Sequence, residues 1–205
     1  MKRILKVGIL VVGAMALLLN LGCSQKSAYS DDTLKGFMLA GVYAVQSYGG
    51  DKEVRAMISG SSDADIINDY KNVLVFYFDT SYNKMCSETL SDYWDITDRD
   101  SLLATLEELK KSEYEYKAWD YARLANNAAL GYCSGYMTKE EVMALLDETL
   151  ALAQSTYSSW EEYHVDFNRG RKSWNPDAPD LDEFTQLTKA ISEGDDAIFT
   201  LVPLN

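Results

Sequence analysis

Apolar residues recur every three or four positions through most of the chain beyond residue 32, which is the period of one face of an α-helix. The first such series begins beside Asp31 and Asp32, either of which is a suitable N-cap, and a Gly49-Gly50 pair predicts its end. We therefore expect one amphipathic helix here, with a face formed by Leu34, Phe37, Met38, Gly41, Val42 and Val45.

A second helix is expected over residues 63–70, and the apolar run that follows it is ambiguous. Residues 73–78 read Val-Leu-Val-Phe-Tyr-Phe, a composition that favours a β-strand by propensity. Because no segment nearby offers a partner strand, we favour a buried continuation of the helix.

Helix start signals are clear in the second half of the chain. Thr97 and Asp100 have the spacing of a capping box, with aspartate in place of the usual glutamate. Thr138 and Glu141 form a full capping box, and the flanking Met137 and Val142 have the spacing of a hydrophobic staple. Each signal predicts a helix that begins just after its threonine.

Two further starts complete the expected fold. Ser158 and Ser159 offer a capping box in two registers, and Asp180 opens a helix after the proline-containing loop at residues 176–179. Residues 197–205 are apolar and are expected to dock as an extended tail. Short turns between so many helices predict one compact all-α, multi-helix domain over residues 33–205.

The first 22 residues have the pattern of an export signal. A basic start precedes an apolar run of 13 residues, 7–19, which is short for a membrane span of about 20 residues. Gly22-Cys23 then resembles the bacterial lipobox, although Asn20 stands where leucine is usual. We expect a lipoprotein signal peptide at 1–22, lipidation of Cys23 and a flexible tether at 23–32; a non-lipidated signal or an uncleaved anchor are the alternatives.

The charge balance restricts the partners. The chain has 19 Lys and Arg against 32 Asp and Glu, a formal charge of −13, which becomes −16 once Lys2, Arg3 and Lys6 leave with the leader. Such a surface repels nucleic-acid phosphates, so we expect no nucleic-acid partner. A basic partner, or a charge that serves solubility alone, fits better.

Few residues suit catalysis or metal binding. His164 is the single histidine, and neither a His-Glu-x-x-His motif nor a Gly-x-Ser-x-Gly motif is present, so no metal or cofactor is expected. A serine nucleophile with His164 as its base stays open. Once Cys23 carries lipid, Cys86 and Cys133 are the remaining cysteines; they either form a disulfide, as exported domains often do, or are simply small buried residues.

Two groups of polar and aromatic residues are the candidate sites. In the first, helical spacing places Asp120, Arg123 and Asn127 on one face, with Trp119 and Asn126 along an overlapping stripe. In an alanine-rich helix, such a set forms either a buried structural network or the floor of a polar pocket. The second group contains Trp160, Arg171 and Trp174, with Gly170-Arg171 at the expected end of a helix. An arginine between aromatic rings stacks on them or binds a carboxylate.

These residues also carry a family resemblance that covers about residues 90–205. The combined motifs resemble the bacterial domain of unknown function family 1266. The resemblance implies a mostly helical domain and brings no agreed activity, substrate or cofactor. Its motifs are Trp94 to Arg99, Ala118-Trp119-Asp120, Arg123, Asn126-Asn127, Gly131-Tyr132, Gly135 to Thr138, Glu140-Glu141, Tyr157 to Tyr163, Gly170-Arg171 and Trp174.

The favoured hypothesis is a non-enzymatic binding domain, anchored by lipid in the cell envelope and facing the periplasm or the exterior. Its partner would be an unknown protein or envelope ligand, contacted by the two candidate groups if they line one cleft. The alternative is a carboxylate-based hydrolase of envelope material that uses acids such as Asp120, Glu140 or Glu141. A third hypothesis is an inhibitor-like protein whose acidic surface blocks a basic partner.

Overall fold

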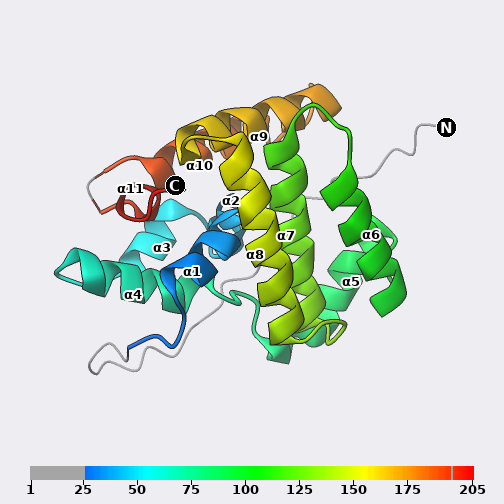
Figure 1. Cartoon of the computed structure of the whole chain (residues 1–205), viewed down its shortest axis with the longest axis horizontal. Helices are drawn as coiled ribbons and strands as arrows, with labels where there is room; N and C mark the ends of the chain where they lie inside the picture. The colour runs from blue at the N-terminus through cyan, green and yellow to red at the C-terminus, as the bar shows by residue number, and fades with distance from the viewer. Residues whose placement is uncertain (1–25, 195) are drawn as a thin grey trace.

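The computed structural model describes residues 26–194 and 196–205, and within them every regular element is a helix (Figure 1). The predicted signal peptide and Cys23 lie outside the described residues. The elements are α1 (Asp31–Met38), α2 (Gly41–Ser47), α3 (Asp51–Met57), α4 (Asp63–Leu74), the 3-10 turn η1 (Thr80–Tyr82), α5 (Asn83–Trp94), α6 (Arg99–Lys111), α7 (Lys117–Cys133), α8 (Lys139–Thr156), α9 (Trp160–Trp174), α10 (Leu181–Ser192) and α11 (Ile198–Leu201). The all-α prediction is confirmed.

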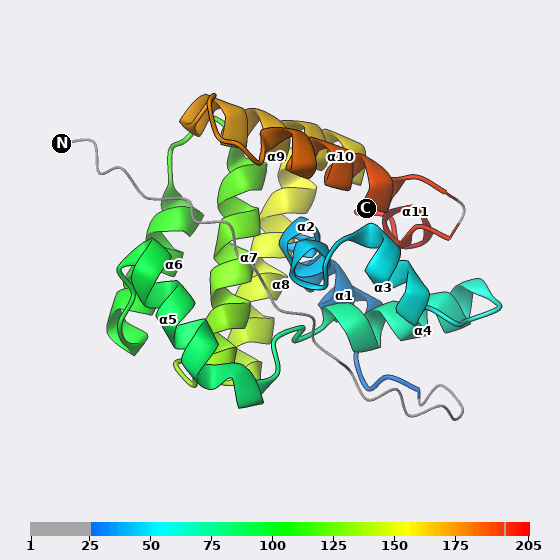
Figure 2. The ribbon, with the colours of Figure 1, turned by 180° about the vertical axis from the view of Figure 1, so that it is seen from behind.

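The antiparallel hairpin of α7 and α8 stands at the centre of the molecule (Figures 1 and 2). Helices α5 and α6 pack against α7, while α1 packs against α8 and α4. Helices α9 and α10 lie together across the end of the hairpin at which α7 begins and α8 ends. The start of α7 is therefore a junction between helices from distant parts of the sequence.

Local capping chemistry sets most helix starts, and two predicted registers need correction. Thr138 caps α8 in a full capping box with Glu141, as predicted. The cap of α6 is Asp98, whose box partner is Ser101, so the predicted Thr97 register is one residue early. Helix α1 is capped by the Ser30 hydroxyl and not by Asp31 or Asp32.

The first predicted helix is in fact two helices. Helix α1 ends at Met38 and α2 begins at Gly41, with the connection buried in the core. At this break the Leu39 carbonyl accepts a hydrogen bond of 2.9 Å from the Tyr163 hydroxyl. A distant side chain thus supplies the bond that a continuous helix would provide, and helical periodicity does not reveal such a partner. The Gly49-Gly50 pair, with φ of 97° and 114°, follows α2 as predicted.

The favoured continuation of α4 is right as far as Leu74 and wrong beyond it. Residues 75–78 belong to no helix or strand, and Phe76 has a left-handed φ of 53°. Its ring lies 4.8 Å from that of Phe37 and 4.6 Å from that of Tyr132. The run is apolar because it crosses the core as a connection, which satisfies the hydrophobic pattern without regular structure.

The C-terminal segment docks on the domain, but it is not wholly extended. It contains the short helix α11, after which Val202 and Leu204 are buried. The Trp160 indole N–H donates to the Val202 carbonyl at 2.9 Å, and the Gln154 amide donates to the Leu204 carbonyl at 2.7 Å. These bonds fasten the tail to α8 and α9.

Cys86 of α5 and Cys133 of α7 form a disulfide, with their Cα atoms 6.1 Å apart. Both residues are buried. The bond fixes the start of α5 to the end of α7.

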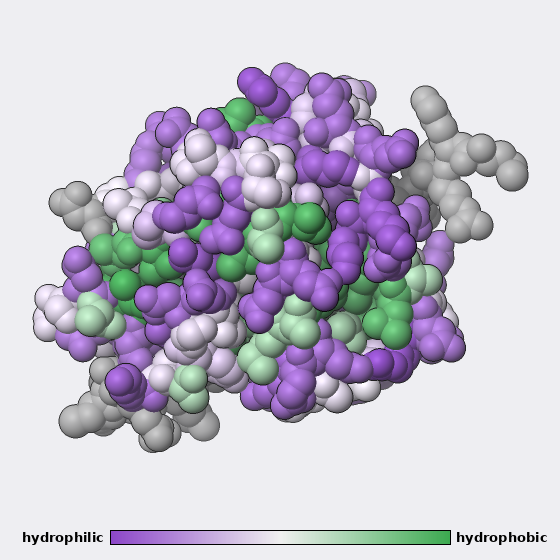
Figure 3. Space-filling model, in the orientation of Figure 1, coloured by the Kyte–Doolittle hydropathy of each residue, from purple (hydrophilic) through white to green (hydrophobic). Residues whose placement is uncertain are grey.

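The face seen in Figure 3 is mainly hydrophilic, with small apolar patches between polar side chains. None of the helices in residues 26–194 and 196–205 is long and apolar enough to cross a membrane.

Candidate functional site

The first candidate group forms a buried polar face on α7. The side chain of Asp120 has no exposed surface and pairs with the guanidinium of Arg123, one turn along the helix. Asn127 lies a further turn along the same face and is also fully buried. Asp120, Arg123 and Asn127 therefore follow one another along one face of α7.

Arg123 lies against two tryptophans, and a third tryptophan packs on one of them. Its guanidinium carbon lies 3.7 Å from the centroid of the Trp119 ring and 5.8 Å from that of Trp94. The Trp119 ring in turn lies 5.5 Å from that of Trp174. We call Trp94, Trp119, Arg123 and Trp174 the Trp–Arg cluster. It reaches the surface, because Trp174 is 40% exposed and the Arg123 side chain 21% exposed.

A glycine lets α9 come close enough to α7 to bring Trp174 to this cluster. A Cβ atom on Gly170 would lie 2.7 Å from Cβ of Trp119 and 2.9 Å from Cβ of Tyr116, closer than carbon atoms normally approach. The predicted end of α9 at Gly170-Arg171 is therefore wrong, since the helix continues to Trp174. Gly170 serves close packing and not helix termination.

Several buried polar atoms of α7 have no hydrogen-bond partner among residues 26–194 and 196–205. A buried polar group left without a partner costs about 1–3 kcal/mol, so native domains contain few of them. The unpartnered atoms are Trp119 Nε1, Asp120 Oδ2, Arg123 Nε and both Asn127 Oδ1 and Nδ2.

Asn126 forms its hydrogen bond outside the Trp–Arg cluster. Its carbonyl oxygen accepts a hydrogen bond of 2.9 Å from the hydroxyl of Tyr77, a residue in the connection after α4. Burial raises the pKa of Tyr77, which keeps its hydroxyl protonated as the donor. Asn126 thus fastens the connection to α7.

The second candidate group is divided by the structure. Trp160 is the first residue of α9 and binds the C-terminal tail. Trp174 is the last residue of α9 and lies about 21 Å from Trp160 along the helix axis. Arg171 pairs with Asp180 at 2.9 Å and stacks on Phe184 at 3.7 Å. Of this group, only Trp174 joins the Trp–Arg cluster, so the two groups do not line one cleft.

The carboxylates of the hydrolase hypothesis are far apart. Glu140 and Glu141 begin α8 at the end of the hairpin remote from Asp120, about 20 Å away along α7. A carboxylate pair in a glycosidase is separated by only about 5–10 Å. Arg99 binds Glu141 at 2.6 Å and lowers the pKa of Glu141 to about 2, so this carboxylate stays ionised.

His164 is buried, and its Nδ1 lies 3.0 Å from the hydroxyl oxygen of Ser192. Burial lowers the pKa of His164 to about 3. A histidine so difficult to protonate is a poor general base, which counts against the serine–histidine alternative. Within the described part of the chain, no cluster of three or more His, Cys, Asp and Glu side chains has the geometry to hold a metal ion.

Two features of this region were missed by sequence reasoning. Trp94 lies against Arg123 but is 29 positions earlier in the chain, so only the packing of α5 on α7 reveals it. Tyr157 and Asp166 cover the first turn of α7, where the Ala118 N–H donates to the tyrosine hydroxyl at 2.8 Å and to the carboxylate at 3.0 Å. Neither pairing has a local sequence signal.

Two curated proteins of Escherichia coli (strain K12) are similar to part of this chain. The uncharacterized protein YbeR is 27% identical over 89 residues, which is 42% of this chain and 38% of YbeR. The uncharacterized protein YbeU is 29% identical over 76 residues, which is 37% of this chain and 32% of YbeU. The matched region thus spans about a third of these relatives, and no solved structure matches the chain.

The matching family model covers the region that contains α7, α8, α9 and the Trp–Arg cluster except Trp94. It extends over residues 110–203, within the 90–205 range of the predicted resemblance. Its description is "Protein of unknown function (DUF1266)", so residues 110–203 of this chain are similar to that family.

Proposed function

We propose that this protein is a lipid-anchored, non-enzymatic binding protein of the cell envelope, and that it contacts its partner through the Trp–Arg cluster. The observation that carries the proposal is a partly exposed arginine stacked on tryptophan rings above buried polar atoms that have no partner in the protein. Tryptophan and arginine are the residue types that contribute most often to binding hot spots.

The geometry of the cluster suits recognition more than catalysis. Trp174 offers an exposed ring, and Arg123, which lies against the same Trp119 ring, offers a partly exposed polar side chain, so the surface has both an apolar and a polar part. The one carboxylate beneath them, Asp120, is fully buried and already paired with Arg123. This placement does not favour Asp120 as a catalytic acid, and it weakens the hydrolase alternative.

Placement in the envelope is supported by two independent features. The leader ending in Gly22-Cys23 resembles a lipoprotein signal, and the Cys86–Cys133 disulfide is typical of proteins that fold in an oxidising compartment. Anchoring through Cys23 would hold the acidic domain outside the cytoplasm.

The binding proposal is tested with Trp174→Ala, because this exposed side chain can be removed without emptying the core. Native envelopes would be treated with a chemical cross-linker, and cross-linked products of the wild-type and variant proteins compared. We expect Trp174→Ala to lose a specific product while its circular dichroism and unfolding midpoint stay close to the wild type. The control is Tyr82→Ala, which removes a ring of similar exposure, 39%, far from the cluster.

Equal cross-linking of both variants and the wild type would contradict the proposal. Arg123→Ala is a less informative test, because it leaves Asp120 buried and unpaired and is expected to destabilise the domain. Arg171→Ala is expected to do the same by leaving Asp180 unpaired.

The anchor is tested separately with Cys23→Ser. We expect the wild-type protein to sediment with membranes and to carry a diacylglycerol-modified Cys23 by mass spectrometry. The serine variant should lose the modification and leave the membrane pellet. A native wild-type protein that retains Met1 and an unmodified Cys23 would rule out the anchor and leave the binding test unaffected.

A further inference from the structure

A cavity of about 370 Å³ is lined by residues of α9, of α10 and of the connection between them. This volume lies within the range of small-molecule sites. Its polar lining comes mainly from the last turns of α9 and the first turn of α10: Asn168, Arg169, Arg171, Lys172, Asp182 and Thr185.

The cavity is a positive region on an acidic protein. Arg169 and Lys172 are exposed, lie one turn apart on α9, and form no ion pair within the described residues. Most other arginines and lysines of the described chain, such as Arg55, Arg99 and Lys110, are paired with carboxylates. Two unpaired cations that line one cavity therefore stand out from a chain whose formal charge is −13.

The start of α10 offers N–H groups to the cavity. Asp180 is the N-cap residue of α10, but its side chain makes no capping bond, and Arg171 holds the carboxylate at 2.9 Å. The N–H groups of the first turn therefore lack their usual side-chain cap. Asp182 and Glu183 lie in the same turn and offset the positive end of the helix dipole, so the positive charge at the cavity comes from the α9 side chains.

A buried polar atom also lies at this cavity. Arg171 is 9% exposed, and its Nε has no hydrogen-bond partner, although its terminal nitrogen binds Asp180. Arg171 is therefore not fully satisfied by the ion pair, and it lines the same cavity as Arg169 and Lys172.

We infer that this α9–α10 cavity binds the phosphate group of a small phosphorylated molecule. Arg169 provides a planar fork for two phosphate oxygens, and Lys172 provides a second positive charge one turn away. Asp182 is the opposing charge on the rim. It weakens the attraction for any anion, in proportion to the charge of that anion.

The position of the cavity favours a soluble phosphate over a lipid headgroup. Helices α9 and α10 lie at one end of the molecule, and residues 26–30, which precede α1, lie at the opposite end (Figures 1 and 2). Lipidation of Cys23 would then tether the domain from the end opposite the cavity.

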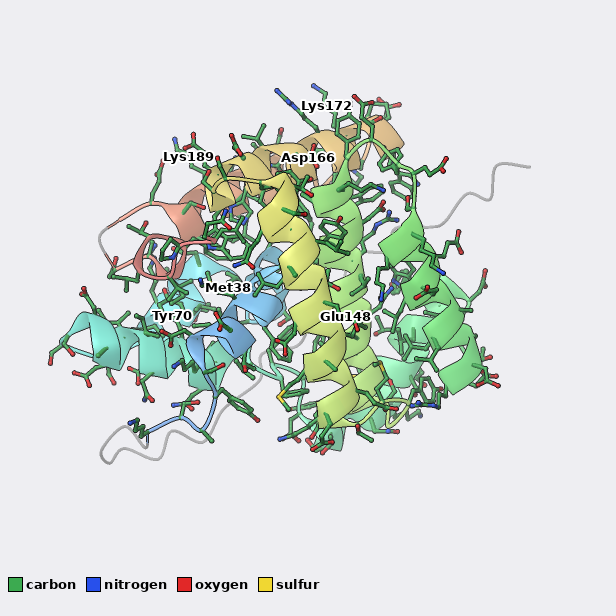
Figure 4. The ribbon with its side chains drawn as sticks, viewed as in Figure 1. Met38, Tyr70, Glu148, Asp166, Lys172 and Lys189 are labelled. Atoms are coloured by element: carbon green, nitrogen blue, oxygen red, sulfur yellow. A yellow bond between two sulfur atoms is a disulfide. The ribbon has the colours of Figure 1, made fainter. Side chains whose placement is uncertain are left out.

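The experiment is a titration of the folded domain with inorganic phosphate and with glycerol 3-phosphate, followed by NMR chemical shifts at constant ionic strength. We expect saturable shifts in residues 168–172 and 181–185. Arg169→Gln and Lys172→Gln should each weaken binding about fivefold, and Asp182→Asn should strengthen it by a similar factor. The control is Lys189→Gln, which removes a lysine from the same helical layer that is paired with Glu193 and does not line the cavity (Figure 4).

Three results would overturn the inference. The first is the absence of saturable shifts with either phosphate. The second is a loss of affinity in Lys189→Gln as large as in Lys172→Gln, which would indicate a general charge effect. The third is binding to phosphatidylglycerol vesicles with no response to the soluble phosphates, which would indicate a membrane contact. The test does not depend on Trp174, so it succeeds or fails independently of the proposed partner surface.

Discussion

His164 is the only histidine of the chain, and its ring is buried between aromatic neighbours. The ring centroid lies 4.8 Å from that of Phe199 and 6.3 Å from that of Trp160. Its Nε2 has no partner, and burial lowers its pKa from 6.5 to about 3. The folded protein therefore holds the imidazole neutral under conditions in which an exposed histidine would be protonated.

This burial predicts a pH-dependent stability. Because the pKa is lower in the folded state than in the unfolded state, the unfolded chain binds more protons between about pH 3 and pH 6.5. Stability is then lost as the pH falls through this window. In urea unfolding, the wild type should lose about 2 kcal/mol more than His164→Asn on moving from about pH 7 to about pH 5. Parallel pH profiles of the two proteins would contradict the assigned role of His164.

At the scale of one helix, the start of α7 has an unusual cap. Its N-cap residue, Tyr116, makes no side-chain capping bond, and the Ala118 N–H is bound instead by Tyr157 and Asp166. Asp166 lies on α9, where it also accepts a 2.6 Å hydrogen bond from the Tyr157 hydroxyl (Figure 4). Burial and this hydrogen bond raise the pKa of Tyr157. One carboxylate thus fixes the angle between α7 and the α9 layer.

Asp166→Ala should therefore loosen the start of α7. We expect a loss of about 1–2 kcal/mol in the free energy of unfolding, the usual effect of removing a helix cap with a favourable charge. Hydrogen exchange should increase in the first turn of α7. Asp147→Ala, which removes an exposed acid from the middle of α8, should change neither measurement. A similar loss in both variants would assign the effect to net charge and not to capping.

Sequence reasoning succeeded for elements whose signals are local. The box at Thr138 and Glu141 was predictable because both partners lie within one helical turn. The break at Leu39 and the irregular connection at Phe76 were not, because each is stabilised by contacts with residues far away in the chain. The predicted ends of these helices were wrong because contacts with distant residues stabilise the chain where the helix stops.

At the scale of the whole molecule, the candidate site was likewise predictable where its residues are neighbours on one helix and unpredictable where they come from different helices. Helical spacing placed Asp120 and Arg123 together, and these two residues do pair because they share one helix. It could not show that Trp94 and Trp174 complete the cluster, since α5 and α9 meet α7 only in the folded domain. It joined Trp160 to Trp174 by their shared helix, although the length of α9 separates them.

The Cys86–Cys133 disulfide makes the stability of the domain depend on the redox conditions around the protein. Cys86 and Cys133 are 47 positions apart, so opening the bond frees a long loop that includes most of α5 and all of α6 and α7. The loop-entropy relation gives a loss of about 4 kcal/mol for this length. The paired variant Cys86→Ala with Cys133→Ala should show a loss of about this size in urea unfolding.

The wild type in dithiothreitol should approach the stability of the paired variant, which should itself be insensitive to the reductant. The Trp–Arg cluster should respond as well, because the disulfide holds the start of α5 and Trp94 ends this helix. We therefore expect reduction to diminish the Trp174-dependent cross-linked product, through weaker positioning of Trp94 beside Arg123 and without any change in Trp174 itself. Titratable free thiols in protein purified under non-reducing conditions, with unfolding unchanged by dithiothreitol, would show that the native domain does not rely on this bond.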